Sequence, residues 1–315
     1  MKTDEKQIRH GVALLAVIIL ILAITGGYMA IDCYLVGDEV VTYGMANSTD
    51  KGWMLSTGRI RAYFEEEILT DSVPQTIQNI TAFGLDLAKN RRGAAYFSYP
   101  RPEECGWYGK EQISGWFSIR EDERFHLGDV YLNAMGDDAN SYLYYELVHL
   151  SGSLFPAISA TKWSAFLVNA VALVAVLLLL YGIAGYFTAD TKRKLMVCLL
   201  FGCSVGCLDL STYLRAYMLA MAFQLALLLV HLKLYQAMRD GMEKAVRRDI
   251  AGLLVLYPLG YIAHYTTGVW AAVLGIATLV WLGKNLTGQA RKKNMRRYVI
   301  CGILAIGIGI LLDPM

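Results

Sequence analysis

The feature that most constrains this chain is an uninterrupted apolar run near its beginning. Gly11 to Ile31 is about 21 residues long and contains no charged residue. At a rise of about 1.5 Å per residue, a helix of this length crosses a hydrocarbon layer of about 30 Å. The run is too long for a signal-peptide core, and Ala30-Ile31-Asp32 is not a small-residue cleavage site. The sequence therefore predicts a retained first transmembrane helix.

Six further apolar runs follow, so seven spans are expected in all. They are Trp163 to Phe187, Leu195 to Leu208, Ala216 to Leu234, Ile250 to Ala263, Gly268 to Leu282, and Tyr298 to Leu312. The runs that start at residues 195, 250 and 298 are short, so they tilt little or borrow flanking residues. A content of 56% apolar and only 18% charged residues also differs from that of a soluble domain. We expect an all-α polytopic membrane protein.

Basic residues predict how the chain is oriented. With the amino terminus in the cytoplasm, sixteen lysine and arginine residues fall on the inner side. They are Lys2, Lys6, Arg9, Lys192, Arg193, Lys194, Arg239, Lys244, Arg247, Arg248, Lys284, Arg291, Lys292, Lys293, Arg296 and Arg297. The short outer loops near 209–214 and 264–267 hold none. Because basic residues collect on the cytoplasmic side, we expect a multi-pass membrane protein with its amino terminus inside and its carboxyl terminus outside.

This orientation divides the chain into three regions. Residues 1–31 form the cytoplasmic amino terminus and the first span, residues 32–162 a large mixed extracytoplasmic loop with juxtamembrane helices, and residues 163–315 a bundle of about six helices. Within the loop, Val73 to Lys89 is predicted to be a helix that starts after Asp71 or Ser72. Ala94 to Ile119 is rich in turn residues and aromatics, which indicates short strands or an irregular cap.

Tyr142 to Phe155 is apolar enough to be a further span, but the charges argue against it. Counting it as a span would move Lys192-Arg193-Lys194 to the outer side. We therefore expect a helix that lies along the outer membrane interface.

The six cysteines do not indicate a metal site. Cys198, Cys203, Cys207 and Cys301 lie in apolar runs and are expected to be small core residues. Cys33 and Cys105 are both expected outside, where a disulfide between them is possible. No zinc-type spacing of cysteine and histidine occurs.

Ionisable residues gather at the outer ends of the expected helices rather than in their middles. They are Asp38-Glu39, Asp137-Asp138, Asp209, Arg215 and His264-Tyr265. A transporter would be expected to place such groups at bilayer depth. Four separate segments at one membrane level instead favour a site at the outer interface.

Each of these groups also has an ordinary structural interpretation. Asp38-Glu39 would stabilise the start of a helix expected from Val40 to Asn47. Arg215 would extend to lipid headgroups, and His264-Tyr265 would belong to an interfacial aromatic belt. Asp137-Asp138 would form a turn. The hypothesis of a site depends on the convergence of these groups.

Several of these segments resemble the GT-C glycosyltransferase superfamily, multispan enzymes that use sugars linked to lipid phosphates, such as the protein O-mannosyltransferases and aminoarabinose transferases. An acidic pair follows the first span in Gly37-Asp38-Glu39-Val40. Arg215-Ala-Tyr217 resembles an Arg-x-Tyr motif at the mouth of the fourth span, and His264-Tyr265 resembles a His-Tyr motif. Lys162-Trp163 with Asn169 fits the helix after the loop.

A further family motif, Asp-x-His-Pro-Pro-Leu-Tyr-Tyr, is present in altered form. Asp138-Ala-Asn140-Ser-Tyr-Leu-Tyr-Tyr145 keeps the aspartate and the Leu-Tyr-Tyr but has lost the histidine and both prolines. The resemblance covers nearly the whole chain in order. Because family members continue for several more spans, it implies a short relative or a fragment.

The resemblance implies transfer of a sugar from a polyprenyl-phosphate donor to an acceptor at the outer face of a cell membrane. A base must take the acceptor's proton, and positive charge must hold the leaving phosphate. The implied roles are Asp38 as the base, Glu39 as the residue that orients it, and Arg215 as the phosphate ligand. His264 and Tyr265 would hold phosphate or sugar, and Asp138 would bind substrate. With Asn140 in place of histidine, no metal and no other cofactor is expected.

The expected partners are the lipid-linked donor and membrane lipids, with no nucleic acid. Two other classes remain open. A non-catalytic binding or sensor protein would hold a ligand in the outer segment and would not need Arg215 and His264 at the level of Asp38. A flippase or transporter would need a polar path across the bilayer, for which Gln224 and Ser204 are the available residues.

Overall fold

The computed structural model describes residues 2–31, 35–47, 63–89, 109, 111, 115, 117–134 and 142–312. All regular elements in these ranges are helices, and no strand occurs in them. The chain divides into two compact units. We call Met1–Leu35 with Ala165–Leu312 the membrane unit and Val36–Ser164 the loop unit.

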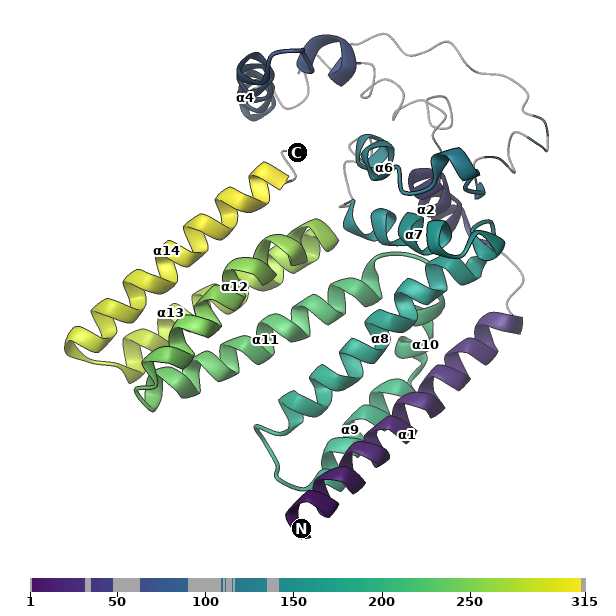
Figure 1. Ribbon diagram of the computed structural model, residues 1–315. Coiled ribbons are helices and arrows are strands. Elements are labelled where there is room, and N and C mark those ends of the chain that lie inside the picture. The colour runs from purple at the N-terminus through teal and green to yellow at the C-terminus, as the bar shows by residue number, and fades with distance from the viewer. Residues whose placement is uncertain are drawn as a thin grey trace. The chain divides into compact units, whose positions relative to one another are not determined.

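One half of the membrane unit is built around α1 (Lys2–Ile31) and α8 (Lys162–Ala184), together with α9 (Thr191–Gly202) and α10 (Val205–Thr212). Helix α1 packs along α9 and α10, as Figure 1 shows. The core between them is aliphatic and includes the fully buried Ile21, Leu173 and Leu177. Gly202 lets the helices approach closely, because a Cβ atom there would lie 2.1 Å from Cδ1 of Ile21.

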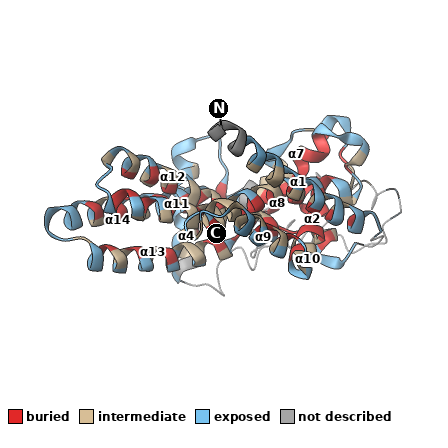
Figure 2. Ribbon diagram, turned by 90° about the horizontal axis from the view of Figure 1, so that it is seen from below, coloured by how far each residue is buried: buried red, intermediate tan, exposed pale blue. Residues whose placement is uncertain are grey.

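The other half contains α11 (Tyr217–Arg239), α12 (Glu243–Ala263), α13 (Tyr265–Asn285) and α14 (Gly288–Leu312). Helix α12 packs against α11, α13 and α14 (Figure 1). Leu227, Leu253 and Leu282 are among the buried residues of this second core. Buried positions follow the inward faces of the helices, whereas the outward faces expose many large aliphatic side chains (Figure 2). Exposed aliphatic faces of this kind are expected where hydrocarbon is the solvent.

The structure supports a multi-pass α-helical membrane protein. Five helices are long and apolar enough to cross a membrane, namely α1, α8, α11, α13 and α14. The α9–α10 pair makes a sixth span if it is one helix bent by 61°. The bend falls where Ser204 caps α10, because its Oγ accepts a hydrogen bond from the backbone N of Cys207 at 3.1 Å.

The expected total of seven spans is not confirmed. The helix that is lacking from the count is α12, which has 21 residues. It begins with the polar stretch Glu243 to Asp249, so its apolar part is short. A crossing by α12 remains a prediction.

The loop unit contains α2 (Gly37–Asn47), the π-helical η1 (Phe64–Ile68), α4 (Val73–Lys89), the 3-10 turn η3 (Glu121–Glu123), α6 (Leu127–Ala134), α7 (Leu143–Leu154) and the 3-10 turn η4 (Pro156–Ile158). Helix α2 packs against α6 and α7.

Three helices predicted in this region are confirmed. The helix expected at Val73–Lys89 has those bounds, the one expected at Val40–Asn47 is α2, and the one expected at Tyr142–Phe155 is α7. The interfacial position of α7 stays a prediction. The segment expected to form strands or a cap, Ala94–Ile119, lies mostly outside the described residues.

The cysteines follow expectation at three positions. Cys198, Cys207 and Cys301 are buried, but Cys203 is exposed at the bend between α9 and α10. The prediction of a core position for Cys203 is therefore wrong, because the break in the helix turns this residue outward. Cys33 and Cys105 lie outside the described residues.

Candidate functional site

The two predicted catalytic acids lie at the start of α2 and differ in burial. Both lie in its first turn, where the partial positive charge of the helix end favours carboxylates. Glu39 is only 4% exposed, and its Oε2 accepts a hydrogen bond from the backbone N of Val36 at 3.0 Å. Asp38 is exposed. Glu39 therefore caps the helix, as its structural interpretation predicts, and Asp38 is the acid presented to the surroundings.

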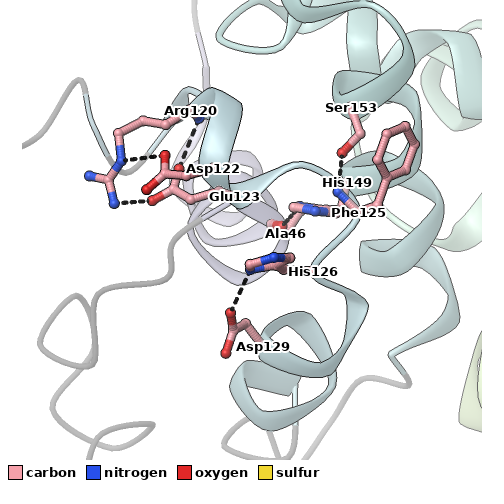
Figure 3. A network of polar contacts seen from close by, with 9 residues as sticks. All are labelled: Ala46, Arg120, Asp122, Glu123, Phe125, His126, Asp129, His149 and Ser153. Atoms are coloured by element: carbon pink, nitrogen blue, oxygen red, sulfur yellow. Dashed lines mark hydrogen bonds and ion pairs between the residues drawn. The ribbon is translucent and has the colours of Figure 1, made fainter.

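The far end of α2 is anchored by side chains from α6 and α7. Nδ2 of Asn133 donates to the carbonyl of Met45 at 3.3 Å. Nδ1 of His149 lies 2.7 Å from the carbonyl of Ala46 and donates to it (Figure 3). The pKa of His149 is lowered, mainly by burial, so the ring is neutral near pH 7. These contacts satisfy carbonyls at the helix end and hold α2 firmly.

A second set of contacts holds η3 against α7 (Figure 3). Glu123 forms an ion pair with the guanidinium of Arg120, and its Oε2 accepts a hydrogen bond from the backbone N of Arg120 at 2.9 Å. Phe125 has a φ of 64°, an unusual value for a residue other than glycine. Its backbone N donates to Oγ of Ser153 on α7 at 3.1 Å. The network joins elements of the loop unit.

In the membrane unit, Arg215 lies in the short connection between α10 and α11. Nδ2 of Asn169, on α8, donates to the carbonyls of Ser211 and Tyr213 at 3.1 and 3.0 Å. The backbone N of Arg215 donates to the same Tyr213 carbonyl at 2.8 Å. Asn169 is fully buried, and Arg215 is 9% exposed. A buried amide therefore fixes the segment that carries the arginine.

His264 separates α12 from α13. Its extended backbone ends one helix, and its Nδ1 caps the next by accepting hydrogen bonds from the backbone N of Thr266 at 3.3 Å and from Oγ1 of Thr266 at 2.8 Å. Because Nδ1 accepts, the proton of the neutral ring lies on Nε2. The pKa of His264 is lowered by burial and then by the charge of Arg215, so the ring is neutral near pH 7.

Aromatic rings extend from this pair. Tyr213 stacks on Tyr217 with centroids 5.9 Å apart, and Tyr217 lies 5.3 Å from the ring of His264. His264 in turn stacks on Tyr265 at 4.6 Å. Tyr217 and Tyr265 are 38% and 54% exposed. We call Tyr213, Arg215, Tyr217, His264 and Tyr265 the Arg215–His264 cluster.

The structure thus brings together three of the predicted site residues, Arg215, His264 and Tyr265. Asp38 and Glu39 belong to the loop unit. Asp138 and its neighbour Asp137 lie outside the described residues. Asp209 is exposed on α10. Among the residues that the structure describes, no three His, Cys, Asp or Glu side chains are grouped to hold a metal ion.

Sequence reasoning missed a polar network in the second core. Nε2 of His231 lies 2.9 Å from the hydroxyl of Tyr298 and 3.0 Å from that of Tyr257, and the two hydroxyls are 2.8 Å apart. Nδ1 donates to the carbonyl of Leu227 at 2.7 Å. We call His231, Tyr257 and Tyr298 the histidine–tyrosine triad. Its members come from three helices, and no spacing along one helix signals it.

Asn169 was noted in the sequence but was not included in the predicted site. Its role could not be read from a pattern, since its partners are backbone carbonyls some 40 residues away in sequence. Comparison with known proteins adds no assignment: no family model, no curated protein and no solved structure matches this chain.

Proposed function

We propose that this protein is a membrane glycosyltransferase of the GT-C type, which moves a sugar from a polyprenyl-phosphate donor to an acceptor at the extracytoplasmic face. The observation that carries the proposal is the Arg215–His264 cluster. It combines a buried cation, a neutral imidazole and exposed aromatic rings between helix ends. These groups suit a ligand that has both a phosphate and a sugar.

Arg215 is assigned to the phosphate of the carrier. A guanidinium presents parallel N–H donors to phosphate oxygens, and burial strengthens the attraction because the local dielectric constant is low. Its segment is held by Asn169, so little ordering is needed when the ligand binds. Arg215 would stabilise the negative charge that grows on the leaving phosphate.

His264 is assigned as a hydrogen-bond donor. Its Nδ1 is used by Thr266, and within the described residues Nε2 makes no hydrogen bond. The Nε2–H group therefore suits a phosphate oxygen or a sugar hydroxyl. Tyr265 and Tyr217 would contact the sugar through their exposed rings.

Asp38 is assigned as the general base. It takes the proton of the acceptor hydroxyl while that oxygen bonds to the anomeric carbon, and the bond from that carbon to the phosphate oxygen breaks with its electron pair on the phosphate. Glu39 acts as a positioning residue, since its carboxylate holds the start of α2. Asp138 is assigned to substrate binding through the resemblance alone.

The proposed orientation places the amino terminus in the cytoplasm. Helices α12 and α14 both begin with a basic segment, and the two segments are in contact. Glu243 of α12 forms ion pairs with Lys293 and Arg297 of α14, at 3.2 and 2.5 Å. These ion pairs lower the pKa of Glu243 to about 2. A shared basic end on parallel helices supports the positive-inside assignment. Labelling of single cysteines placed at Gly241 and at Asp71 in intact cells would test it.

One observation favours a second candidate, a non-catalytic protein that binds a lipid-linked ligand. Glu39, half of the predicted acidic pair, is engaged in capping α2. Such a protein would need Arg215 and His264 but not Asp38.

The test is binding and turnover of polyprenyl-phosphate sugars by the purified protein. Asp38→Asn should abolish transfer while binding persists, and Arg215→Ala should weaken binding. Asp71→Asn and Arg193→Ala, which change exposed charges elsewhere, should match the wild type in both assays. Binding by the wild type without transfer would support the second candidate. Absence of binding would exclude both.

A further inference from the structure

A long groove runs between α12, α13 and α14. It has a volume of about 590 Å³ and is lined by apolar side chains except for the tyrosine hydroxyls at Tyr257, Tyr261 and Tyr298. Small residues on two walls, among them Gly275 and Gly302, keep it open. A Cβ atom added to Gly302 would meet nothing within 4 Å. The groove is distinct from the Arg215–His264 cluster, and no residue of that cluster lines it.

One exposed face of α14 lines this groove and continues beyond it. Val299, Ile303, Ile306 and Ile310 line the groove and follow one another at steps of four, three and four residues, the spacing of a single helix face. Steps of three and four back from Val299 lead to Arg296 and Lys292. This face therefore carries apolar residues along the groove and cations at its entrance.

The five cations of α14 differ in their partners. Lys293 and Arg297 form ion pairs with Glu243 of α12. Lys292 and Arg296 are exposed, and in the described part of the chain neither forms an ion pair. Three exposed cations of this helix thus form no ion pair in the described part of the chain, namely Arg291, Lys292 and Arg296. The last two lie on the face that leads into the groove.

We propose that the groove binds one chain of an anionic glycerophospholipid, whose phosphate pairs with Lys292 and Arg296. From Val299 to Ile310 the helix rises about 17 Å at about 1.5 Å per residue, which is close to half of a hydrocarbon core of about 30 Å. One leaflet's chain therefore fits its length. An apolar groove open to the bilayer takes hydrocarbon rather than water, and the two cations select an anionic headgroup. This inference does not depend on the proposed transferase activity.

The experiment is native mass spectrometry of the full chain, titrated with phosphatidylglycerol and, separately, with phosphatidylcholine of identical chains. The wild type should retain phosphatidylglycerol about tenfold more strongly than phosphatidylcholine. Two changes should remove this preference: Lys292→Gln with Arg296→Gln, which removes the cations, and Gly302→Phe, which fills the groove. Thermal unfolding of each variant checks that it is folded.

Matched controls lie on other faces. Lys192→Gln with Lys244→Gln removes the same charge from exposed positions, and Gly307→Phe adds the same ring to an exposed glycine of α14 that does not line the groove. Both should bind phosphatidylglycerol like the wild type. Equal retention of the two lipids by the wild type would overturn the proposal. Loss of phosphatidylglycerol binding in the control variants would also overturn it. The same holds if the wild type forms a protein dimer instead of a lipid adduct and this dimer disappears with Gly302→Phe.

Discussion

The membrane unit contains two polar clusters that differ in how completely their groups are satisfied. In the histidine–tyrosine triad, both ring nitrogens of His231 and both tyrosine hydroxyls have partners inside the protein. In the Arg215–His264 cluster, the histidine uses one nitrogen, and two tyrosine rings are exposed. A satisfied network joins helices, whereas a ring nitrogen that makes no hydrogen bond within the described residues, such as Nε2 of His264, is available to a ligand. The contrast separates a structural group from a candidate site of similar composition.

The largest effect is expected from the arginine of the Arg215–His264 cluster. Arg215→Ala should weaken binding of the polyprenyl-phosphate sugar about 10- to 100-fold, because a hydrogen bond to a charged group contributes about 1.5–3 kcal/mol. Arg215→Lys should recover only part of the loss, since lysine lacks the planar fork. Equilibrium binding in detergent micelles measures both. Unchanged affinity in Arg215→Ala would remove the phosphate role from this residue.

The triad should show the opposite pattern. His231→Phe leaves the tyrosine hydroxyls and the Leu227 carbonyl with fewer partners, so we expect a loss of about 1–2 kcal/mol of stability, near the upper range for polar contacts between membrane helices. Carrier binding should not change once the protein is folded. Thermal unfolding measures the loss of stability, and the binding assay measures the affinity for the carrier. A folded variant that no longer binds carrier would show that the triad is part of the site.

Removing an exposed ring of the Arg215–His264 cluster should have a smaller effect on binding. Tyr265→Ala should weaken binding of the carrier-linked sugar about 2- to 10-fold, since contacts of an aromatic ring contribute about 0.5–1.5 kcal/mol beyond buried area. Tyr265→Phe should match the wild type. The bare polyprenyl phosphate, tested in parallel, should bind both variants equally. If Tyr265→Ala weakens the bare carrier as much as the sugar-linked one, the ring contacts lipid or phosphate rather than sugar.

The smallest effect is expected from protonation of His264. Burial and the charge of Arg215 lower its pKa below the ordinary value of 6.5, so the folded state holds fewer protons on this ring than the unfolded state. Stability should therefore be full above pH 6.5 and fall as the pH drops toward the folded pKa. His264→Gln should reduce this loss. His149, whose pKa is lowered in the same direction, should account for part of the remainder.

Unfolding temperatures measured between pH 7.5 and 5 test this directly. His149→Gln serves as the comparison variant, because it removes a buried histidine of the loop unit. An identical pH profile for the wild type and His264→Gln would show that His264 does not titrate in this range.

Much of the helical framework was predictable because its signals are local. The length of an apolar run predicts a span, and the start signal before Val73 predicts the helix at Val73–Lys89. Glu39 shows where local reasoning became ambiguous. Its position in a first turn is compatible with capping and with catalysis alike, and only the hydrogen bond to Val36 shows that it caps the helix.

The candidate site was predictable only in part. Arg215 and His264 were identified because Arg215 directly precedes one apolar run and His264 directly follows another, and the outer ends of such runs share a membrane level. Asn169 was not assigned, since an amide in an apolar helix carries no sign of which distant carbonyls it will bind. His231 was not identified either, because it lies within a run and its partners Tyr257 and Tyr298 are typical aromatic residues of membrane helices.

The sequence by itself determined that this chain is helical and crosses a membrane several times, because both properties follow from the hydrophobicity and length of short segments. The tertiary structure alone decided which polar side chains bond to one another inside the protein and which stay accessible at helix ends. It paired His231 with two tyrosines, placed Arg215 beside a neutral His264, and paired Lys293 and Arg297 of α14 with Glu243. These distinctions depend on contacts between distant helices, and no local pattern of residues specifies them.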